Sequence, residues 1–345
     1  MNRLDVARAR LYNFKNYRLQ RLAARHGKNL VKPTWFCIKF TERCNSKCVH
    51  CDIWIVNKAD GELTTEQWKR TLEDIRRWAG PVMVVFTGGE VFLRKDALEV
   101  IRYASDLGLV SEVLTNGLLT NRQQCEELVL ARPYQVTISL DGVTPGTHFA
   151  VRRIPKMYEK IIETIDNLDE FRASHKTDLK ILIKMVMMKP NLHEVVPMAD
   201  WVKERGQGEL MVQPIEQNYA QDEDRQWYKK SNLWIQDLDR VREVVRQLVE
   251  RKRAGFPIRN SVDNLEVMVD YFENPDPNMR KIQRHIATQK PEMCLTGVSS
   301  FVLSGNGDVR WCFGMPPAGN VKQSTPQELW ENRCECWKVD CGYYL

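Results

Sequence analysis

Between residues 35 and 214, short apolar runs alternate with longer stretches in which apolar residues recur at helical spacing. The short runs are rich in β-branched and aromatic residues, and they predict strands at 35–40, 82–86, 110–115, 134–140, 179–187 and 209–214. The longer stretches predict amphipathic helices at 64–79, 93–107, 121–130, 156–171 and 192–205. Strands and helices are therefore expected to alternate along more than half of the chain.

Repeated strand–helix units predict a parallel sheet, because each helix carries the chain back to begin the next strand in the same direction. Right-handed crossovers would curl that sheet into a barrel. The expected fold class is α/β, a partial (β/α)6 barrel of the TIM type. In such folds the chemistry gathers on the loops that follow the strands. Periodicity by itself does not separate a closed barrel from an open sheet.

The pattern changes after residue 215 and becomes polar. The elements expected there are helices at 232–254 and 261–273, hairpin strands at 299–303 and 309–313, and a helix at 325–332. We therefore expect four parts: a basic amphipathic helix at 1–30, a barrel at 31–215, a helical linker at 216–290 and a small hairpin-plus-helix cluster-binding domain at 291–345.

Composition and charge exclude several classes of protein. The chain of 345 residues is 43% hydrophobic and 28% charged, unlike disordered, collagen or coiled-coil chains. Its apolar runs are far shorter than the roughly 20 residues of a spanning helix. Its amino-terminal segment lacks the apolar core of a secretory signal, so a cytoplasmic location is expected. The net charge of +6 does not indicate nucleic acid, because no basic run is interleaved with aromatic residues.

Eight of the ten cysteines fall into two groups, a usage that points to metal binding in a cytosolic chain. The first group, Cys44, Cys48 and Cys51, directly follows the first predicted strand with the spacing CX3CX2C. Three closely spaced thiolates suit three corners of a [4Fe–4S] cluster and leave one iron open. Zinc is the alternative, although structural zinc prefers paired CX2C units with four closed ligands. His50 lies inside the short spacing and is badly placed as a fourth ligand.

Further polar and glycine residues follow the next strands in order, and they are Gly88, Gly89, Glu90, Asn116, Ser139 and Arg152. Together with the CX3CX2C loop, this ordered set resembles the radical S-adenosylmethionine (SAM) superfamily over about residues 35–215. The resemblance implies that the three loop cysteines hold a [4Fe–4S] cluster at which SAM is reductively cleaved. The resulting 5′-deoxyadenosyl radical would remove a hydrogen atom from the substrate.

The resemblance also implies roles in SAM binding for these residues. Glu90 would accept a hydrogen bond from the ammonium group of the SAM methionine, and the two glycines before it would let the backbone approach the ligand closely. Asn116 would hydrogen-bond the ribose, and His50 would pack near the adenine. Ser139 and Arg152 would hold the carboxylate, although the arginine next to Arg152 could face inward instead.

The second group of cysteines lies near the carboxyl end and consists of Cys294, Cys312, Cys334, Cys336 and Cys341. Its CX12GX4C pattern on a predicted hairpin, followed by a helix and further cysteines, resembles the twitch or SPASM extension of radical SAM enzymes. Five cysteines suffice for one auxiliary cluster, expected to be [4Fe–4S], with one cysteine to spare. The expected ligands are Cys294, Cys312, Cys336 and Cys341, with Cys334 as the spare or substitute. A zinc ribbon is the alternative.

Two further segments carry predictions. After the sixth strand, barrel geometry places Glu216 and Tyr219 toward the cavity, as candidates for substrate contact or proton transfer. The basic amino-terminal helix is expected to dock on the barrel with its charged face in solvent. Contact of that helix with a membrane surface is the less favoured alternative.

These features predict a radical SAM enzyme that acts on a small polar metabolite of the sugar or cyclitol type, with net oxidation. A reducing partner such as flavodoxin or ferredoxin would supply the electron. The alternatives are a maturase acting on a peptide and an enzyme acting on a lipid or glycolipid. Two non-catalytic hypotheses are also open: a zinc-stabilised binding protein, and an iron–sulfur electron carrier that binds no SAM.

Overall fold

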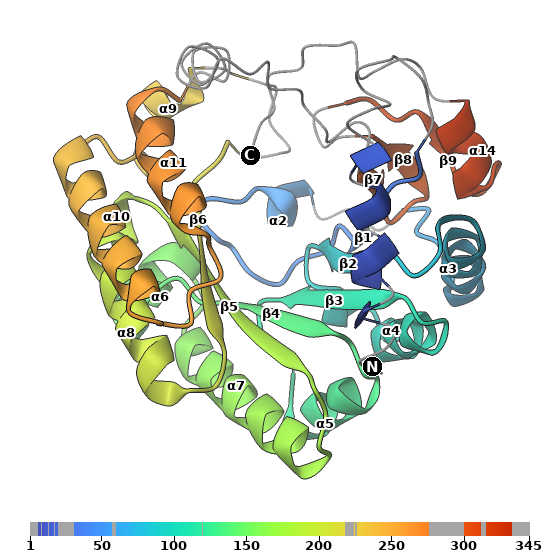
Figure 1. The fold of residues 1–345 in the computed structure, drawn as a ribbon, viewed down its shortest axis with the longest axis horizontal. Helices are drawn as coiled ribbons and strands as arrows, with labels where there is room; N and C mark the ends of the chain where they lie inside the picture. Colours follow the sequence, from blue (N-terminus) through green and yellow to red (C-terminus); the bar gives the residue numbers. More distant parts are fainter. Residues whose placement is uncertain are drawn as a thin grey trace.

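The computed structural model describes residues 6–19 without 8, 13 and 17, then 31–56, 60–118, 120–217, 224, 226–275, 300–311 and 315–332. Figure 1 shows a curved sheet with helices on its outer face. Within the described ranges, no helix combines the length and the apolar character needed to cross a membrane.

The strands form one sheet in the order β6-β5-β4-β3-β2-β1-β7-β8-β9. Its barrel strands are β1 (Trp35–Thr41), β2 (Met83–Gly88), β3 (Val110–Thr115), β4 (Gln135–Ser139), β5 (Lys180–Met187) and β6 (Glu209–Pro214). All neighbours among these six strands pair in parallel. The edge strands in this order are β6 and β9, and β7 lies on the outer side of β1, so the described strands do not close into a full barrel. The predicted α/β partial barrel is confirmed.

Helices link the strands and pack against the outer face of the sheet. They are α3 (Thr65–Ala79), α4 (Ala97–Asp106), α5 (Arg122–Leu130), α6 (Pro145–Arg152), α7 (Met157–Ser174) and α8 (Val195–Arg205). Shorter turns of helix are α2 (Ile53–Val56), η1 (Val91–Leu93) and η2 (Lys189–Glu194). The sequence pattern missed α6, which begins with Pro145 after the capping residue Thr144. Its eight residues are too few to show a clear helical period.

Helix α3 illustrates how local sequence sets an element. The side chain of Thr64 accepts a hydrogen bond from the backbone of Gln67, whose side chain bonds back to Thr64, so a capping box begins the helix. The apolar positions Trp68 and Leu72 are fully buried against the sheet. Gly80 ends the helix with a positive φ of 85°. The predicted helix at 64–79 is thus confirmed together with its cap.

In the described residues between 224 and 275, the chain after the barrel forms the helices α9 (Trp227–Lys230), α10 (Leu238–Arg253) and α11 (Val262–Glu273). Trp234 lies at the centre of their aromatic contacts, with ring centroids 5.4 Å from Tyr271 and 4.8 Å from Phe272. The hydroxyl of Tyr271 donates to the carbonyl of Ile215 over 2.7 Å. This packing fixes the helices against the end of β6.

The carboxyl-terminal hairpin extends the barrel sheet. Its elements are β7 (Ser300–Leu303), β8 (Asp308–Arg310), β9 (Gly319–Asn320) and α14 (Pro326–Glu331). Strand β7 pairs in parallel with β1, while β8 and β9 add antiparallel strands. In Figure 1, α14 lies beside α3.

Aromatic side chains join this hairpin to the barrel. Trp330 of α14 packs against Trp78 of α3 and against Trp311, with ring centroids 6.1 and 5.4 Å apart. Phe301 of β7 contacts Phe36 of β1 at 5.1 Å. Burial of such large rings is a strong source of stability, so the hairpin and the barrel share one core.

Candidate functional site

The cysteine loop follows β1 and lies against the residues that follow β2. The backbone amide of Gly89 donates to the carbonyl of Thr41 over 2.8 Å, and the amide of Glu90 donates to that of Arg43 over 2.8 Å. A Cβ atom on Gly88 would lie 2.3 Å from the Thr41 oxygen, and one on Gly89 would lie 1.9 Å from the Arg43 oxygen. Both glycines are therefore required by the close approach of the cysteine loop. Their contribution to cofactor binding stays a prediction.

Glu90 is fully buried and fixed by three hydrogen bonds. Its carboxylate accepts from the hydroxyl of Thr115 over 2.8 Å, from the amide of Asn116 over 2.7 Å and from the amide of Phe92 over 3.2 Å. Burial raises the pKa of the Glu90 carboxyl, and these donors partly offset that rise. The side chain thus connects the ends of β2 and β3 and holds its carboxylate in one orientation.

Asn116 ties the end of β3 to the cysteine loop. Its side-chain amide donates to the side-chain oxygen of Asn45 over 2.8 Å, and its own oxygen accepts from the amide of Leu118 over 2.9 Å. Asn116 thus makes a local turn and also contacts the residue that follows Cys44. The predicted ribose contact is untested by this geometry.

Of the two adjacent arginines, Arg152 faces inward and Arg153 is exposed. The Nε of Arg152 donates to Asp141 over 2.5 Å, and its Nη1 donates to the sulfur of Cys48 over 3.3 Å. The hydroxyl of Ser46 lies 3.1 Å from the same sulfur. Although burial disfavours its charge, the negative charge of Asp141 leaves the pKa of Arg152 raised, so the guanidinium stays positive beside the thiol.

Asp141 is a site residue that the sequence did not single out beyond its place after β4. One of its carboxylate oxygens accepts from the amide of Val186 over 2.8 Å, while the other binds Arg152. Its own amide donates to Nδ1 of His148 over 3.2 Å. Burial by itself would raise the pKa of Asp141, but the positive charge of Arg152 leaves that pKa lowered. The carboxylate therefore stays charged and orients the arginine.

His50 and Ser139 lie at the same end of the barrel. Burial, reinforced by the charge of Arg152, lowers the pKa of His50 to about 4, so the imidazole is neutral near pH 7. Its Nδ1 has no hydrogen-bond partner in the described part of the chain. Ser139 ends β4 and pairs in register with Lys184 of β5. Both predicted SAM contacts are placed at the barrel mouth, and their roles stay predictions.

The loop cysteines fit an iron–sulfur group by their chemistry. None of the described cysteines forms a disulfide. Burial raises the pKa of the Cys44 thiol to about 11 and also raises that of Cys51, so their thiolates need a compensating positive charge such as a metal. The sulfur of Cys48 already accepts a hydrogen bond from Arg152 and shares another with the hydroxyl of Ser46. Among the described residues, no three Cys, His, Asp or Glu side chains are gathered as a ready-made metal site. Cluster binding by this loop is therefore a prediction.

The remaining predicted residues divide into two sets. Glu216 follows β6 and accepts a hydrogen bond from the side chain of Gln213 over 2.8 Å. Tyr219 lies outside the described residues. So do all five carboxyl-terminal cysteines, Cys294, Cys312, Cys334, Cys336 and Cys341. The proposed catalytic pair and the auxiliary cluster are thus left untested by the geometry.

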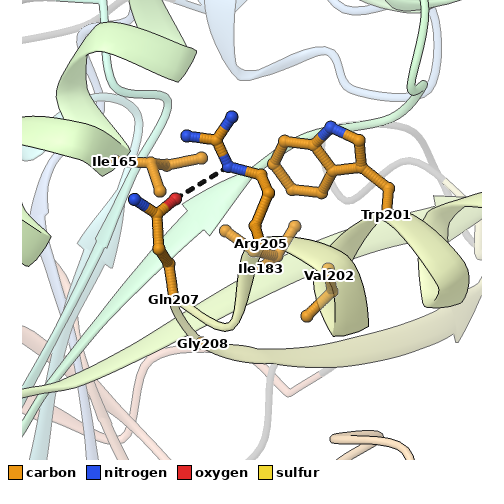
Figure 2. A pocket seen from close by; sticks show the side chains of 7 residues that line it. All are labelled: Ile165, Ile183, Trp201, Val202, Arg205, Gln207 and Gly208. Carbon is orange, nitrogen blue, oxygen red and sulfur yellow. Dashed lines mark hydrogen bonds between the residues drawn. The ribbon is translucent and has the colours of Figure 1, made fainter.

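Two cavities lie away from the cysteine loop. One of about 370 Å³ lies beside α6 and the start of α7, and its lining includes His148, Phe149 and Tyr158 but not Arg152. The other, of about 10 Å³, lies between α7, β5 and α8, where Arg205 donates to the side chain of Gln207 over 2.7 Å (Figure 2). Neither cavity is lined by a predicted cofactor residue. The candidate site is therefore identified by the contacts of the cysteine loop and not by a cavity.

Comparisons with known proteins agree with this geometry. Residues 38–202 match the Radical SAM superfamily. The chain is 25% identical over 302 residues to the AdoMet-dependent heme synthase of Methanosarcina barkeri, covering 87% of this chain and 82% of that protein. It is 27% identical over 290 residues to the PqqA peptide cyclase of Bradyrhizobium diazoefficiens, covering 84% of this chain and 66% of that protein.

A solved structure shares the fold. Streptococcus suis SuiB bound to its precursor peptide SuiA superposes with a TM-score of 0.65 at 15% identity, covering 95% of this chain and 70% of SuiB. The chain thus spans about two thirds of the length of the peptide cyclase and of SuiB. The likeness to SuiB shows a common fold.

Proposed function

The chain belongs to the radical SAM superfamily through residues 38–202, and we propose that it is a radical SAM enzyme that modifies a peptide. The family uses a [4Fe–4S] cluster and SAM. When bound, these cofactors supply a carbon-centred radical that removes a hydrogen atom from a C–H bond of the substrate. The protein residues bind and orient both cofactors and the substrate.

The cysteine loop and its partners would form the cluster end of the site. We assign Cys44, Cys48 and Cys51 as the cluster ligands. Arg152 places a positive charge 3.3 Å from the Cys48 sulfur, where it would offset part of the negative charge of a bound cluster. Asp141 holds that guanidinium in place through the hydrogen bond to its Nε.

Glu90 is the proposed partner of the methionine ammonium. A carboxylate offers about four acceptor positions, and three are already used by the donors described above. The remaining position can accept a donor from the ligand. Because burial raises the pKa of Glu90, an arriving cation would also stabilise its charged form.

The other proposed SAM contacts line the same end of the barrel. Asn116, Ser139 and Arg152 follow or end strands β3, β4 and helix α6, and His50 belongs to the cysteine loop. The neutral imidazole of His50 suits packing against an uncharged purine.

A peptide substrate is supported by the PqqA peptide cyclase, whose similarity covers 84% of this chain. That share is larger than the barrel and includes residues that follow it. None of the relatives reported above acts by name on a sugar or cyclitol, so the expected metabolite substrate has no support from them. Glu216, at the barrel mouth beyond β6, is the described candidate for contact with the peptide.

A tetrapyrrole substrate is the second candidate function. One observation favours it: the AdoMet-dependent heme synthase is matched over 82% of its own length, more than the peptide cyclase. The same radical chemistry would then act on a side chain of the macrocycle.

The proposal also includes a second cofactor and a protein partner. Four of the five carboxyl-terminal cysteines, Cys294, Cys312, Cys336 and Cys341, would hold one auxiliary [4Fe–4S] cluster, with Cys334 as the spare or substitute. When bound, that cluster would supply an acceptor for one electron from the substrate radical, which also loses a proton to solvent, so the reaction would be a net oxidation. A flavodoxin or ferredoxin would supply the electron that begins the reaction.

The test begins with anaerobic purification and measurement of iron and sulfide. Dithionite and SAM are then added, and 5′-deoxyadenosine is followed by mass spectrometry. We expect its formation by the native chain and by the Cys125→Ala variant, whose thiol lies on helix α5, and its loss in Cys48→Ala. Formation that persists in Cys48→Ala would contradict the assignment of the loop.

Substrate class is tested in the same assay with two probes. Stimulation of 5′-deoxyadenosine formation by a pool of synthetic peptides, with a change in peptide mass, supports the peptide function. Stimulation by coproporphyrin in place of the peptides supports the tetrapyrrole function and overturns the first proposal.

A further inference from the structure

Lys184 lies inside the barrel near the carboxyl end of β5. Its neighbours Ile183 and Met185 are buried against the helices at 2% and 0% exposure. Because side chains alternate along a strand, Lys184 points to the opposite, interior face of the sheet. In register it lies beside Ser139 of β4 and Met211 of β6. This places the lysine next to the proposed SAM contacts.

The amine of Lys184 makes no hydrogen bond or ion pair with any residue in the described ranges. The acidic groups whose charges reach it are Glu216, Glu112 and Asp141. Each of these is bonded elsewhere. Glu112 accepts from the side chains of Gln135 and Thr137, Asp141 binds Arg152, and Glu216 accepts from Gln213.

An ammonium in this position is costly without an anion. Burial lowers the pKa of Lys184, although the negative charges of Glu216 and Glu112 oppose that shift. The residue is only partly buried and lies on the interior face of the sheet, so its amine faces the interior of the barrel. A carboxylate that reached it would form a charge-assisted hydrogen bond and would restore the charge balance.

We infer that Lys184 binds a carboxylate of the substrate inside the barrel, beside the SAM site. The inference rests on the proposed function and narrows its substrate class to carboxylate-bearing molecules. The carboxylate belongs either to an acidic residue or carboxyl terminus of a peptide, or to a side chain of a tetrapyrrole. Its place between Ser139 and Glu216 would hold the neighbouring C–H bonds near the reactive end of SAM.

The first test measures protection of the amine in the native, cluster-loaded chain with SAM bound. The protein is treated briefly with an acetylating reagent, and acetylation of Lys184 is quantified by peptide mass spectrometry. The probes are acidic synthetic peptides, the same peptides with Asp and Glu changed to Asn and Gln, coproporphyrin, and its methyl ester. The internal control is Lys180, an exposed lysine on the same strand.

We expect one of the two carboxylate probes to slow acetylation of Lys184 at least about fivefold, while its neutral analogue leaves the rate unchanged. Lys180 should react equally throughout. Protection by the peptide or by the porphyrin identifies the source of the carboxylate. Equal rates with every probe would overturn the inference, as would an amine that never reacts.

The second test uses Lys184→Met and Lys184→Arg, with Lys180→Met as the matched control. Lys184→Met should raise the KM of the protecting probe by about 10- to 100-fold and leave the KM of its neutral analogue unchanged. Lys184→Arg should retain most of the affinity. SAM binding, measured by equilibrium dialysis, should be equal in all variants, and a selective loss in Lys184→Met would assign the lysine to SAM instead.

The two proposals fail differently. If the native chain cleaves SAM while Lys184 is unprotected, the inference is wrong and the proposed function stands. If the native chain with its full iron content cleaves no SAM, the proposed function itself is wrong, whatever the acetylation rates.

Discussion

The guanidinium of Arg152 donates a hydrogen bond to the sulfur of Cys48 over 3.3 Å, across 104 positions of sequence. The same guanidinium pairs with Asp141, so a buried carboxylate, a cation and a proposed cluster ligand form one chain of contacts. The backbone reinforces the contact, since the amide of Val49 donates to the carbonyl of Val151 over 2.9 Å. The cysteine loop is thus held by helix α6 as well as by β2.

Replacing Arg152 by Gln should reduce SAM cleavage at least about tenfold, because the charge beside Cys48 is lost. It should also lower the free energy of unfolding by about 3 kcal/mol, because Asp141 is left buried without its partner. The exposed neighbour supplies the control, and Arg153→Gln should change neither quantity. Adding Asp141→Asn to Arg152→Gln should recover stability but not cleavage, and recovery of both would contradict a role for this charge in the site.

Gly89→Ala should prevent assembly of the cysteine loop. The new methyl group would lie 1.9 Å from the carbonyl oxygen of Arg43, which forces the loop away from β2. We expect iron content to fall below half and the free energy of unfolding to fall by about 3 kcal/mol. Gly146→Ala is the matched control, because nothing lies within 4 Å of the added atom. Normal iron content in Gly89→Ala would show that the loop tolerates the displacement.

Protonation of His148 in the unfolded state should make the protein less stable in mild acid. Burial and the charge of Arg152 lower the pKa of His148 to about 4, below its value in the unfolded chain. The unfolded state therefore binds more protons between about pH 6.5 and 4, and stability falls as the pH falls through that window. The loss should reach about 2 kcal/mol at pH 5.

Denaturant unfolding of the cluster-free protein at pH 7 and pH 5 measures this loss. His148→Gln should remove about half of the pH dependence, because His50 has a similarly lowered pKa and contributes the rest. His193→Gln, at a side chain 61% exposed, should leave the pH dependence unchanged. An unchanged slope in His148→Gln would assign the acid sensitivity to other groups.

Trp330→Ala should loosen the hairpin from the barrel and cost about 3–5 kcal/mol in the free energy of unfolding. The indole packs among Trp78, Trp311 and Phe301, and its Nε1 donates to the carbonyl of Val31 over 2.7 Å. Trp330→Phe should cost less than Trp330→Ala, because it loses only the hydrogen bond, worth about 1 kcal/mol, and part of the ring packing. The two variants are compared by denaturant unfolding, and equal costs would contradict a packing role.

The sequence by itself determined the alternation of strands and helices and the order of the site motifs. Strands β3 and β6 match their predicted bounds, because a run of apolar and β-branched residues between turn residues is a local signal. The cysteine spacing and the Gly-Gly-Glu segment are likewise local, and their places after β1 and β2 follow from strand order in a parallel sheet.

Only the tertiary structure decided the features that depend on contacts between residues far apart in the sequence. The inward direction of Arg152 rather than Arg153 depends on a carboxylate that follows β4. The need for Gly89 depends on the path of another loop. The pairing of β7 with β1 joins residues 265 positions apart, such as Trp35 and Ser300. Within the described part of the chain, the amine of Lys184 is left without a partner because the nearby carboxylates of Glu112 and Asp141 bind other side chains. Such features depend on contacts between distant segments, which no local period or spacing encodes.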